Sequence, residues 1–297
     1  IMNENHFDFY LSTTFCKDHP RIDNILKYCT ENGIYHIELG SNHAYEDNPA
    51  SIVQRYPCQY LVHNYFPIPK ESFVVNIASL NDDLYERSVS HVFAAIDFCS
   101  RIDAKLYTFH PGFLSDPGKS SSCSSNYDFQ FKNEQIPELR YENAFERMLC
   151  AVKCIVAYAH EKNVRIAIET EGSVLHKNHL LMQYPKEFSR FFDIFSPQVI
   201  GINLNIGHLR LAANVFGFDI ADFIDLISEH VVAMELSHNG GHYDEHLPLV
   251  DGEWYWDVIF DSRFTNAYKI LEFRDTSIED VLRNIKLADS ILNNLRY

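Results

Sequence analysis

The chain has 297 residues, 46% of them hydrophobic, and its formal net charge is −16 with a pI of about 5.3. This length suits a single α/β barrel of roughly 250 residues, and the excess of acid argues against duplex DNA, because phosphate contacts need Lys and Arg. No apolar run reaches the roughly 18 residues of a membrane span and no signal peptide is recognised, so we expect a cytoplasmic protein.

Short apolar segments alternate with segments of helical periodicity along the whole chain. The predicted strands are residues 7–13, 34–39, 59–63, 105–110, 164–169, 199–205, 231–238 and 267–272. The predicted helices are residues 21–32, 49–55, 81–101, 138–163, 185–195, 220–229, 254–261 and 277–293.

Eight strand–helix units predict parallel pairing and a closed (β/α)8 barrel, the TIM barrel, with residues 1–297 forming one domain. An open, doubly wound sheet is the alternative. The long irregular stretch 113–137, which includes a run of serines, is expected to form a lid loop over the site.

Six successive predicted strands end on a side chain that can bind a metal ion, and three more such side chains follow closely. The strand-end residues are His63, His110, Glu169, Asn205, His238 and Glu272, and the three that follow are His208, Asp244 and His246. Function collects at the C-terminal ends of barrel strands, so these side chains are expected to meet. A single histidine at a strand end is more often a packed residue than a ligand, but six consecutive strands favour a metal site.

The stretch 234–246, M-E-L-S-H-N-G-G-H-Y-D-E-H, concentrates this chemistry in one loop. Asp244 and His246 lie two residues apart, so in extended backbone they point to the same side. Imidazole and carboxylate in combination are ligands of Zn²⁺ and Mn²⁺. A histidine-rich surface loop without metal is the simpler alternative.

Over nearly its whole length the chain resembles the xylose isomerase-like barrel superfamily, which includes endonuclease IV and many sugar isomerases and epimerases. The resemblance rests on motifs that occur in the superfamily's order: H-N-Y-F at 63–66, N-I-A-S at 76–79, F-H-P-G at 109–112, I-E-T at 168–170, N-I-G-H at 205–208, S-H at 237–238, D-E-H at 244–246 and L-E at 271–272.

The resemblance to endonuclease IV implies three ions held by nine ligands. His63, His110 and Glu169 would hold one ion; Glu169, Asn205, His238 and Glu272 a second; and His208, Asp244 and His246 a third. Asn205 departs from the pattern, because the superfamily has Asp there and a neutral amide oxygen is a weaker ligand. One ion of Zn or Mn is therefore favoured, with up to three possible.

The sugar isomerases of the superfamily keep one ion, here at Glu169, Asn205, His238 and Glu272. The stretch 33–40, G-I-Y-H-I-E-L-G, is similar to theirs, and the acidic loop after it differs from the DNA-contacting loop of the endonucleases. The resemblance therefore implies a metal-dependent isomerase or epimerase of a sugar-like small molecule. Glu169 and Glu272 would transfer the proton, and His208 and Trp254 would contact the substrate.

Two alternatives remain open at this point. One is an endonuclease IV-like metal-dependent phosphodiesterase, which the full set of histidines favours. The other is a non-catalytic metal-binding barrel, in which Asn205 marks a degenerate site. No membrane or nucleic-acid partner is expected, and a homo-oligomer is left open.

Overall fold

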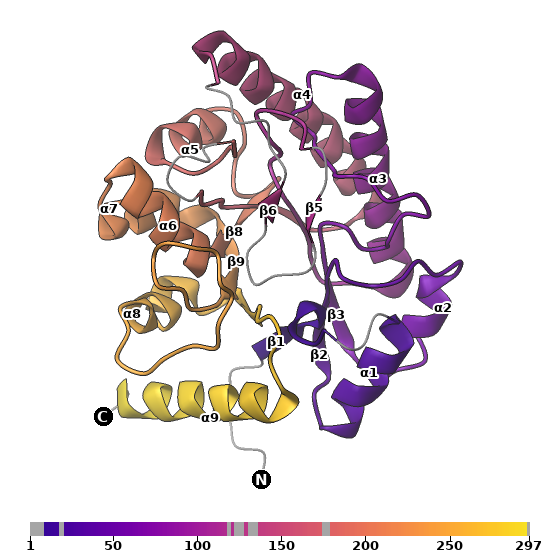
Figure 1. Cartoon of the computed structure of the whole chain (residues 1–297), viewed down its shortest axis with the longest axis vertical. Helices are drawn as coiled ribbons and strands as arrows, with labels where there is room; N and C mark the ends of the chain where they lie inside the picture. Colours follow the sequence, from indigo (N-terminus) through magenta and orange to yellow (C-terminus); the bar gives the residue numbers. More distant parts are fainter. Residues whose placement is uncertain are drawn as a thin grey trace.

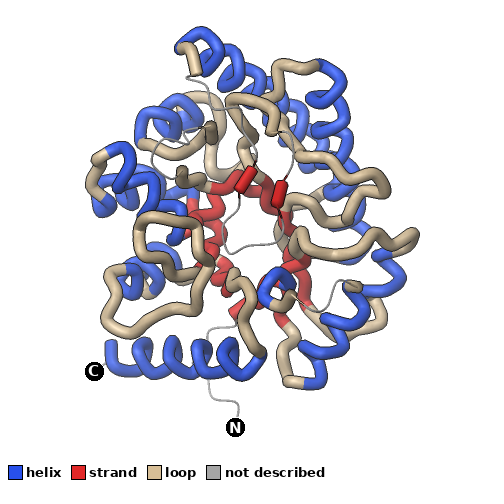
Figure 2. The backbone as a smooth tube through the Cα atoms, in the orientation of Figure 1, coloured by secondary structure: helices blue, strands red, loops and turns tan. Residues whose placement is uncertain are grey.

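The computed structural model describes residues 9–17, 21–117, 120–121, 128–129, 136–173 and 179–295. Eight parallel strands close into a barrel with the order β1-β10-β9-β8-β7-β4-β3-β2. Figure 2 shows this ring of strands with the helices around it. The predicted closed (β/α)8 barrel is confirmed.

The barrel strands are short and almost wholly buried. They are β1 (Phe9–Ser12), β2 (His36–Leu39), β3 (Gln59–His63), β4 (Tyr107–Phe109), β7 (Ile166–Glu169), β8 (Gly201–Asn205), β9 (Val231–Leu236) and β10 (Tyr268–Leu271). A separate two-stranded sheet pairs β5 (Ser120–Ser121) with β6 (Asp128–Phe129).

The helices cover the outside of the ring (Figure 1). They are α1 (Ile22–Glu31), α2 (Pro49–Val53), α3 (Asp82–Ile102), α4 (Glu138–Lys162), α5 (Pro185–Phe192), α6 (Ile206–Phe216), α7 (Ile220–Ile227), α8 (Tyr255–Ile259) and α9 (Ile278–Leu295), with short 3-10 turns at Thr13–Phe15, Ser228–His230 and Ser262–Phe264. Among the described residues, no helix is both long and apolar enough to cross a bilayer.

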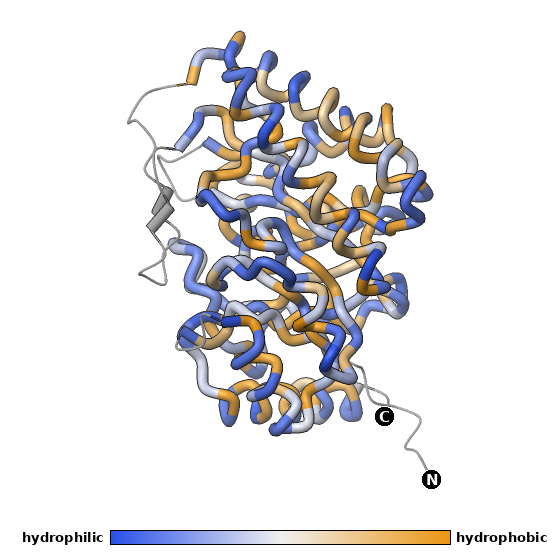
Figure 3. The backbone as a smooth tube through the Cα atoms, turned by 90° about the vertical axis from the view of Figure 1, so that its right-hand side faces the viewer, coloured by the Kyte–Doolittle hydropathy of each residue, from blue (hydrophilic) through white to orange (hydrophobic). Residues whose placement is uncertain are grey.

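Hydrophobic and hydrophilic residues alternate along the helices, as Figure 3 shows. The apolar faces pack on the outer faces of the strands and form the large core between the two layers. A second, smaller core contains one or two apolar residues from most of the strands: Tyr10, Leu61, Leu106, Ala167, Val232, Ala233 and Ile270.

The sequence prediction omitted α6, which begins immediately after β8. Its first residue follows Asn205, whose side chain accepts a hydrogen bond from the backbone N–H of His208 and so caps the helix. Gly217 ends the helix with a φ of 69°. Because α6 starts at the strand end, its first turn lies at the C-terminal mouth of the barrel.

The predicted lid, residues 113–137, falls largely outside the described residues, since 118–119, 122–127 and 130–135 belong to the undescribed part. Its role as a lid stays a prediction.

Candidate metal centre

Three acidic residues of the centre lie two positions beyond residues of the small apolar core. Ala167 precedes Glu169 in this way, as Ala233 precedes Glu235 and Ile270 precedes Glu272. Side chains two apart on a strand point to the same face. An apolar layer therefore forms the floor of the barrel interior, and a polar layer lies above it at the C-terminal mouth.

The first group of possible ligands is His63, His110 and Glu169, whose ligand atoms all lie within 4.8 Å of one another. Glu169 Oε2 lies 3.7 Å from His63 Nε2 and 3.5 Å from His110 Nε2, and this buried oxygen has no hydrogen-bond partner among the described residues. Two ligands of a tetrahedral Zn²⁺ lie about 3.4 Å apart. The spacing is too long for a hydrogen bond and fits a shared ion.

The second group is His208, Asp244 and His246. His208 lies in the first turn of α6, and the other two lie in the loop after β9. Asp244 Oδ2 is 2.9 Å from His246 Nε2, whereas Asp244 Oδ1 is 3.5 Å from His208 Nε2 and has no hydrogen-bond partner among the described residues. The 3.5 Å between Asp244 Oδ1 and His208 Nε2 is again close to the distance between two ligand atoms of one metal ion.

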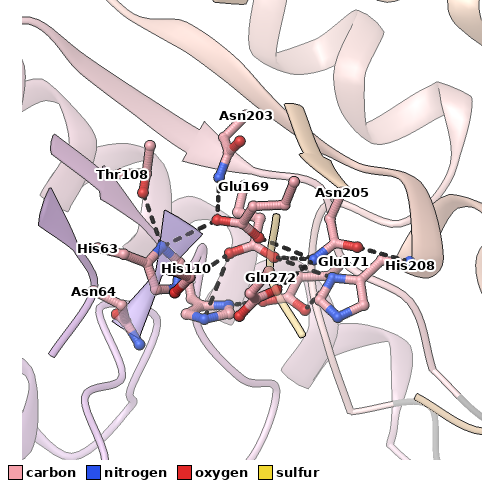
Figure 4. Close-up of polar contacts among 12 residues, drawn as sticks. His63, Asn64, Thr108, His110, Glu169, Glu171, Asn203, Asn205, His208 and Glu272 are labelled. Atoms are coloured by element: carbon pink, nitrogen blue, oxygen red, sulfur yellow. Dashed lines mark hydrogen bonds and ion pairs between the residues drawn. The ribbon is translucent and has the colours of Figure 1, made fainter. Parts of the chain in front are cut away.

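Between the two groups lies the side chain of Asn205, which is fully buried. Its amide nitrogen donates to Glu235 Oε2 at 2.9 Å and to Glu169 Oε1 at 3.0 Å, and it lies 3.4 Å from Glu272 Oε2. Figure 4 shows Asn205 with Glu169 and Glu272. An amide nitrogen, and not the expected carbonyl oxygen, therefore faces the centre.

A third group joins Glu38, His63 and Glu235, all of them buried. Neither carboxylate oxygen of Glu38 has a hydrogen-bond partner among the described residues. Burial, with the nearby Glu272, raises the pKa of Glu38 well above its usual range, and burial with Glu169 does the same to the pKa of Glu235.

The histidines of the first group differ in their electrostatics. Burial lowers the pKa of His63 to about 4, so this imidazole is neutral and able to bind a metal ion at pH 7. Burial also opposes the charged form of His110, but Glu169 and Glu171 outweigh it and raise its pKa to about 9. His110 Nδ1 forms a short hydrogen bond with Glu171 (Figure 4), which is how metal-binding histidines are commonly oriented.

Four of the sequence-predicted residues belong to none of these groups: Asn205 and Glu272, which contact members of them, and His238 and Trp254. His238 follows the end of β9, pairs its backbone with Leu247, and places its ring Nδ1 3.4 Å from the hydroxyl of Tyr255. Trp254 is partly buried against the core and its ring packs on that of Tyr255. The predicted roles of His238 and Trp254 rest on the resemblance alone.

Three residues of the centre were not proposed from the sequence: Glu38, Glu171 and Glu235. The alternation of the strands could have found two of them. Glu235 follows Ala233 on the inner face of β9, and Glu38 occupies the inner face of β2, since its neighbour Ile37 packs in the outer core.

Comparisons with known proteins agree with this architecture. Uncharacterized protein MJ1614 of Methanocaldococcus jannaschii is 25% identical over 255 residues, which are 84% of this chain and 86% of that protein. A D-tagatose 3-epimerase-like protein superimposes with a TM-score of 0.74 at 16% identity, covering 98% of this chain and 100% of the other. Endonuclease IV from Thermus thermophilus gives a TM-score of 0.59 at 14% identity, covering 96% of this chain and 98% of the other.

The structural similarities lie below 25% identity and establish the fold alone. The sequence profile of the xylose isomerase-like TIM barrel family matches residues 23–290, which is nearly the whole chain. The chain therefore belongs to the xylose isomerase-like TIM barrel family.

Proposed function

We propose that the protein is a divalent-metal-dependent isomerase or epimerase that acts on a sugar or a related keto-sugar. The observation that supports this most directly is the placement of Glu169 and Glu272. They lie at the ends of β7 and β10, which are separated in the ring by β8 and β9, and yet their carboxylates approach the same atom, Asn205 Nδ2, at 3.0 and 3.4 Å. The shared amide keeps the two carboxylates close together at the mouth of the barrel, as a pair of acids that remove and return a proton requires.

The first and second ligand groups fit a Zn²⁺ or Mn²⁺ ion, since each combines imidazoles with a buried carboxylate oxygen that lacks a hydrogen-bond partner among the described residues. His63, His110 and Glu169 would hold one ion, and His208, Asp244 and His246 another. When bound, such an ion supplies a Lewis acid for a carbonyl or hydroxyl oxygen of the substrate.

The protein's own groups would then carry the proton. One of Glu169 and Glu272 accepts the proton from the carbon next to the carbonyl, and the other returns a proton to the neighbouring atom or to the opposite face, a contribution of about 10²–10⁴-fold. Glu272 is held by His246, whose Nδ1 lies 3.1 Å from its Oε2. His208 and Trp254 remain proposed substrate contacts.

A metal-dependent phosphodiesterase is the second candidate, and the completeness of both flanking histidine groups favours it. Charge argues for the isomerase. The whole chain carries a formal net charge of −16. This charge repels a polyanionic substrate and does not repel a neutral sugar.

Solvent exchange tests the proposal. Metal-loaded protein is incubated in D₂O with a panel of ketoses and aldoses, and NMR follows the loss of the carbon-bound proton next to the carbonyl. We expect exchange with the wild type, its loss in Glu169→Gln and Glu272→Gln, and its retention in Glu229→Gln, an exposed residue near the start of β9. Cleavage of a phosphodiester or nicking of abasic DNA without sugar exchange would overturn the proposal, and metal binding with neither activity would favour a non-catalytic barrel.

A further inference from the structure

The centre of the carboxylate cluster is filled by a side-chain amide. We propose that the Asn205 amide takes the place of a cation there, so that the protein holds its ions in the two flanking groups and none between them. This inference rests on the proposed metal dependence, and it departs from the resemblance, which implies an ion at Asn205 itself.

Asn205 Nδ2 lies where three carboxylates converge. Its two N–H groups donate to Glu235 Oε2 at 2.9 Å and to Glu169 Oε1 at 3.0 Å, and Glu272 Oε2 lies 3.4 Å away. The first two are distances of N–H···O hydrogen bonds, and all three exceed the roughly 2.0–2.2 Å of metal–oxygen bonds. An ion at this point would have to displace the amide.

The amide is fixed in this orientation by its own oxygen. Asn205 Oδ1 accepts the backbone N–H of His208 at 3.1 Å, and the backbone N–H of Asn205 donates to Thr170 Oγ1 at 2.9 Å. A reversed amide would turn its oxygen toward three carboxylates and its nitrogen toward another N–H donor. The hydrogen bonds therefore favour nitrogen at the centre and oxygen toward α6, and reversal would also remove the cap of α6, worth about 0.5–2 kcal/mol.

The amide also lies between the two possible ion sites. It holds Oε1 of Glu169, which leaves Oε2 facing His63 and His110 in the first group. On the other side, Glu272 is held by His246 of the second group. A neutral donor between the groups thus orients the carboxylates without adding a third ion.

Glu235 completes the arrangement by accepting two amides. Its Oε2 accepts from Asn205, and its Oε1 accepts from Asn203 Nδ2 at 2.6 Å. Asn203 is also fully buried. Asn203 is therefore a matched control, since Asn203→Asp makes the same change of charge beside Glu235 without opening the point where three carboxylates converge.

Metal counting tests the inference. Wild type, Asn205→Asp and Asn203→Asp are loaded with Zn²⁺, dialysed, checked for folding by circular dichroism, and counted by native and inductively coupled plasma mass spectrometry. We expect two ions per chain in the wild type, three in Asn205→Asp and two in Asn203→Asp, because only the first substitution replaces the central donor with an oxygen ligand. Asn205→Ser keeps a capping oxygen and removes the amide, so it tests the same point if the aspartate variant does not fold, and it too should admit a third ion.

Three ions in the wild type, or anomalous scattering from zinc among Glu169, Glu235 and Glu272, would overturn the inference and leave the proposed function intact. Equal counts in wild type, Asn205→Asp and Asn205→Ser would also overturn it. Wild-type protein without any bound ion would overturn the metal dependence of the proposed function as well, so the two failures are distinguishable.

Discussion

Gly172, in the loop after β7, sets how closely that loop can approach the first turn of α6. A Cβ added at Gly172 would lie 2.3 Å from the backbone oxygen of His208, 2.7 Å from its Cα and 2.8 Å from its carbonyl carbon. These are backbone atoms and cannot rotate aside. Gly172→Ala must therefore push the first turn of α6 away, at a cost near the upper end of the 1–3 kcal/mol typical of overpacking.

For a chain of 297 residues, whose unfolding entropy is about 0.6 kcal/mol/K, a loss of about 3 kcal/mol corresponds to a fall in Tm of about 5 °C. Because His208 belongs to the second ligand group, the substitution should also weaken Zn²⁺ binding there. Calorimetric unfolding and a zinc titration measure the two effects. Gly240→Ala is the control, since its Cβ would meet only Glu245 Oε2 at an ordinary 3.4 Å and should cost less than about 0.5 kcal/mol. Equal Tm values for the two variants would refute the steric argument.

Two further predictions concern buried carboxylates. Glu171→Gln removes the anionic acceptor that orients His110, so the affinity of the first group for Zn²⁺ or Mn²⁺ should fall about 10–100-fold in a calorimetric titration. The control variant Glu229→Gln should leave this affinity unchanged. An unaltered affinity in Glu171→Gln would show that this contact does not support the site. Burial raises the pKa of Glu187 from 4.5 to about 7. The folded state then binds its proton more tightly than the unfolded state, so its stabilising contribution is full below about pH 4.5 and is lost as the pH rises to about 7, a change of about 3 kcal/mol. Urea unfolding between pH 4.5 and 8 should show a steeper decline in the wild type than in Glu187→Gln, and parallel curves would contradict this.

The barrel could be predicted from the sequence because its strands and most helices differ clearly in period and in bounding residues. The helix α6 could not be found by period. Ile206, Leu209, Leu211, Ala212 and Ala213 are all buried, and the polar stripe is reduced to Arg210 and Asn214, so the helical repeat is weak. Its signals are the cap at Asn205 and the glycine with positive φ at Gly217, which are local and easily attributed to a loop.

For the centre, strand position predicted that side chains meet at the strand ends and the resemblance implied the two groups, but neither indicated which atoms face one another. His63, His110 and Glu169 meet as a group, as do His208, Asp244 and His246. The orientation of the Asn205 amide depends on a hydrogen bond from the first turn of α6. Since that helix was absent from the prediction, the sequence offered no reason to expect the nitrogen at the centre.

The sequence prediction ended β9 at His238, but the strand residue that faces Asn205 is Glu235. The strand ends at Leu236, and at the register of Asn205 its inner face carries Glu235. A carboxylate there and an amide at 205 are complementary, because the amide donates and the carboxylate accepts. An alanine at 235 would remove both acceptor oxygens from the buried amides of Asn203 and Asn205, at about 1–3 kcal/mol for each donor left unpaired. Asn205 and Glu235 therefore act as one unit, and the departure from the superfamily's aspartate at 205 is matched by the acid that faces it.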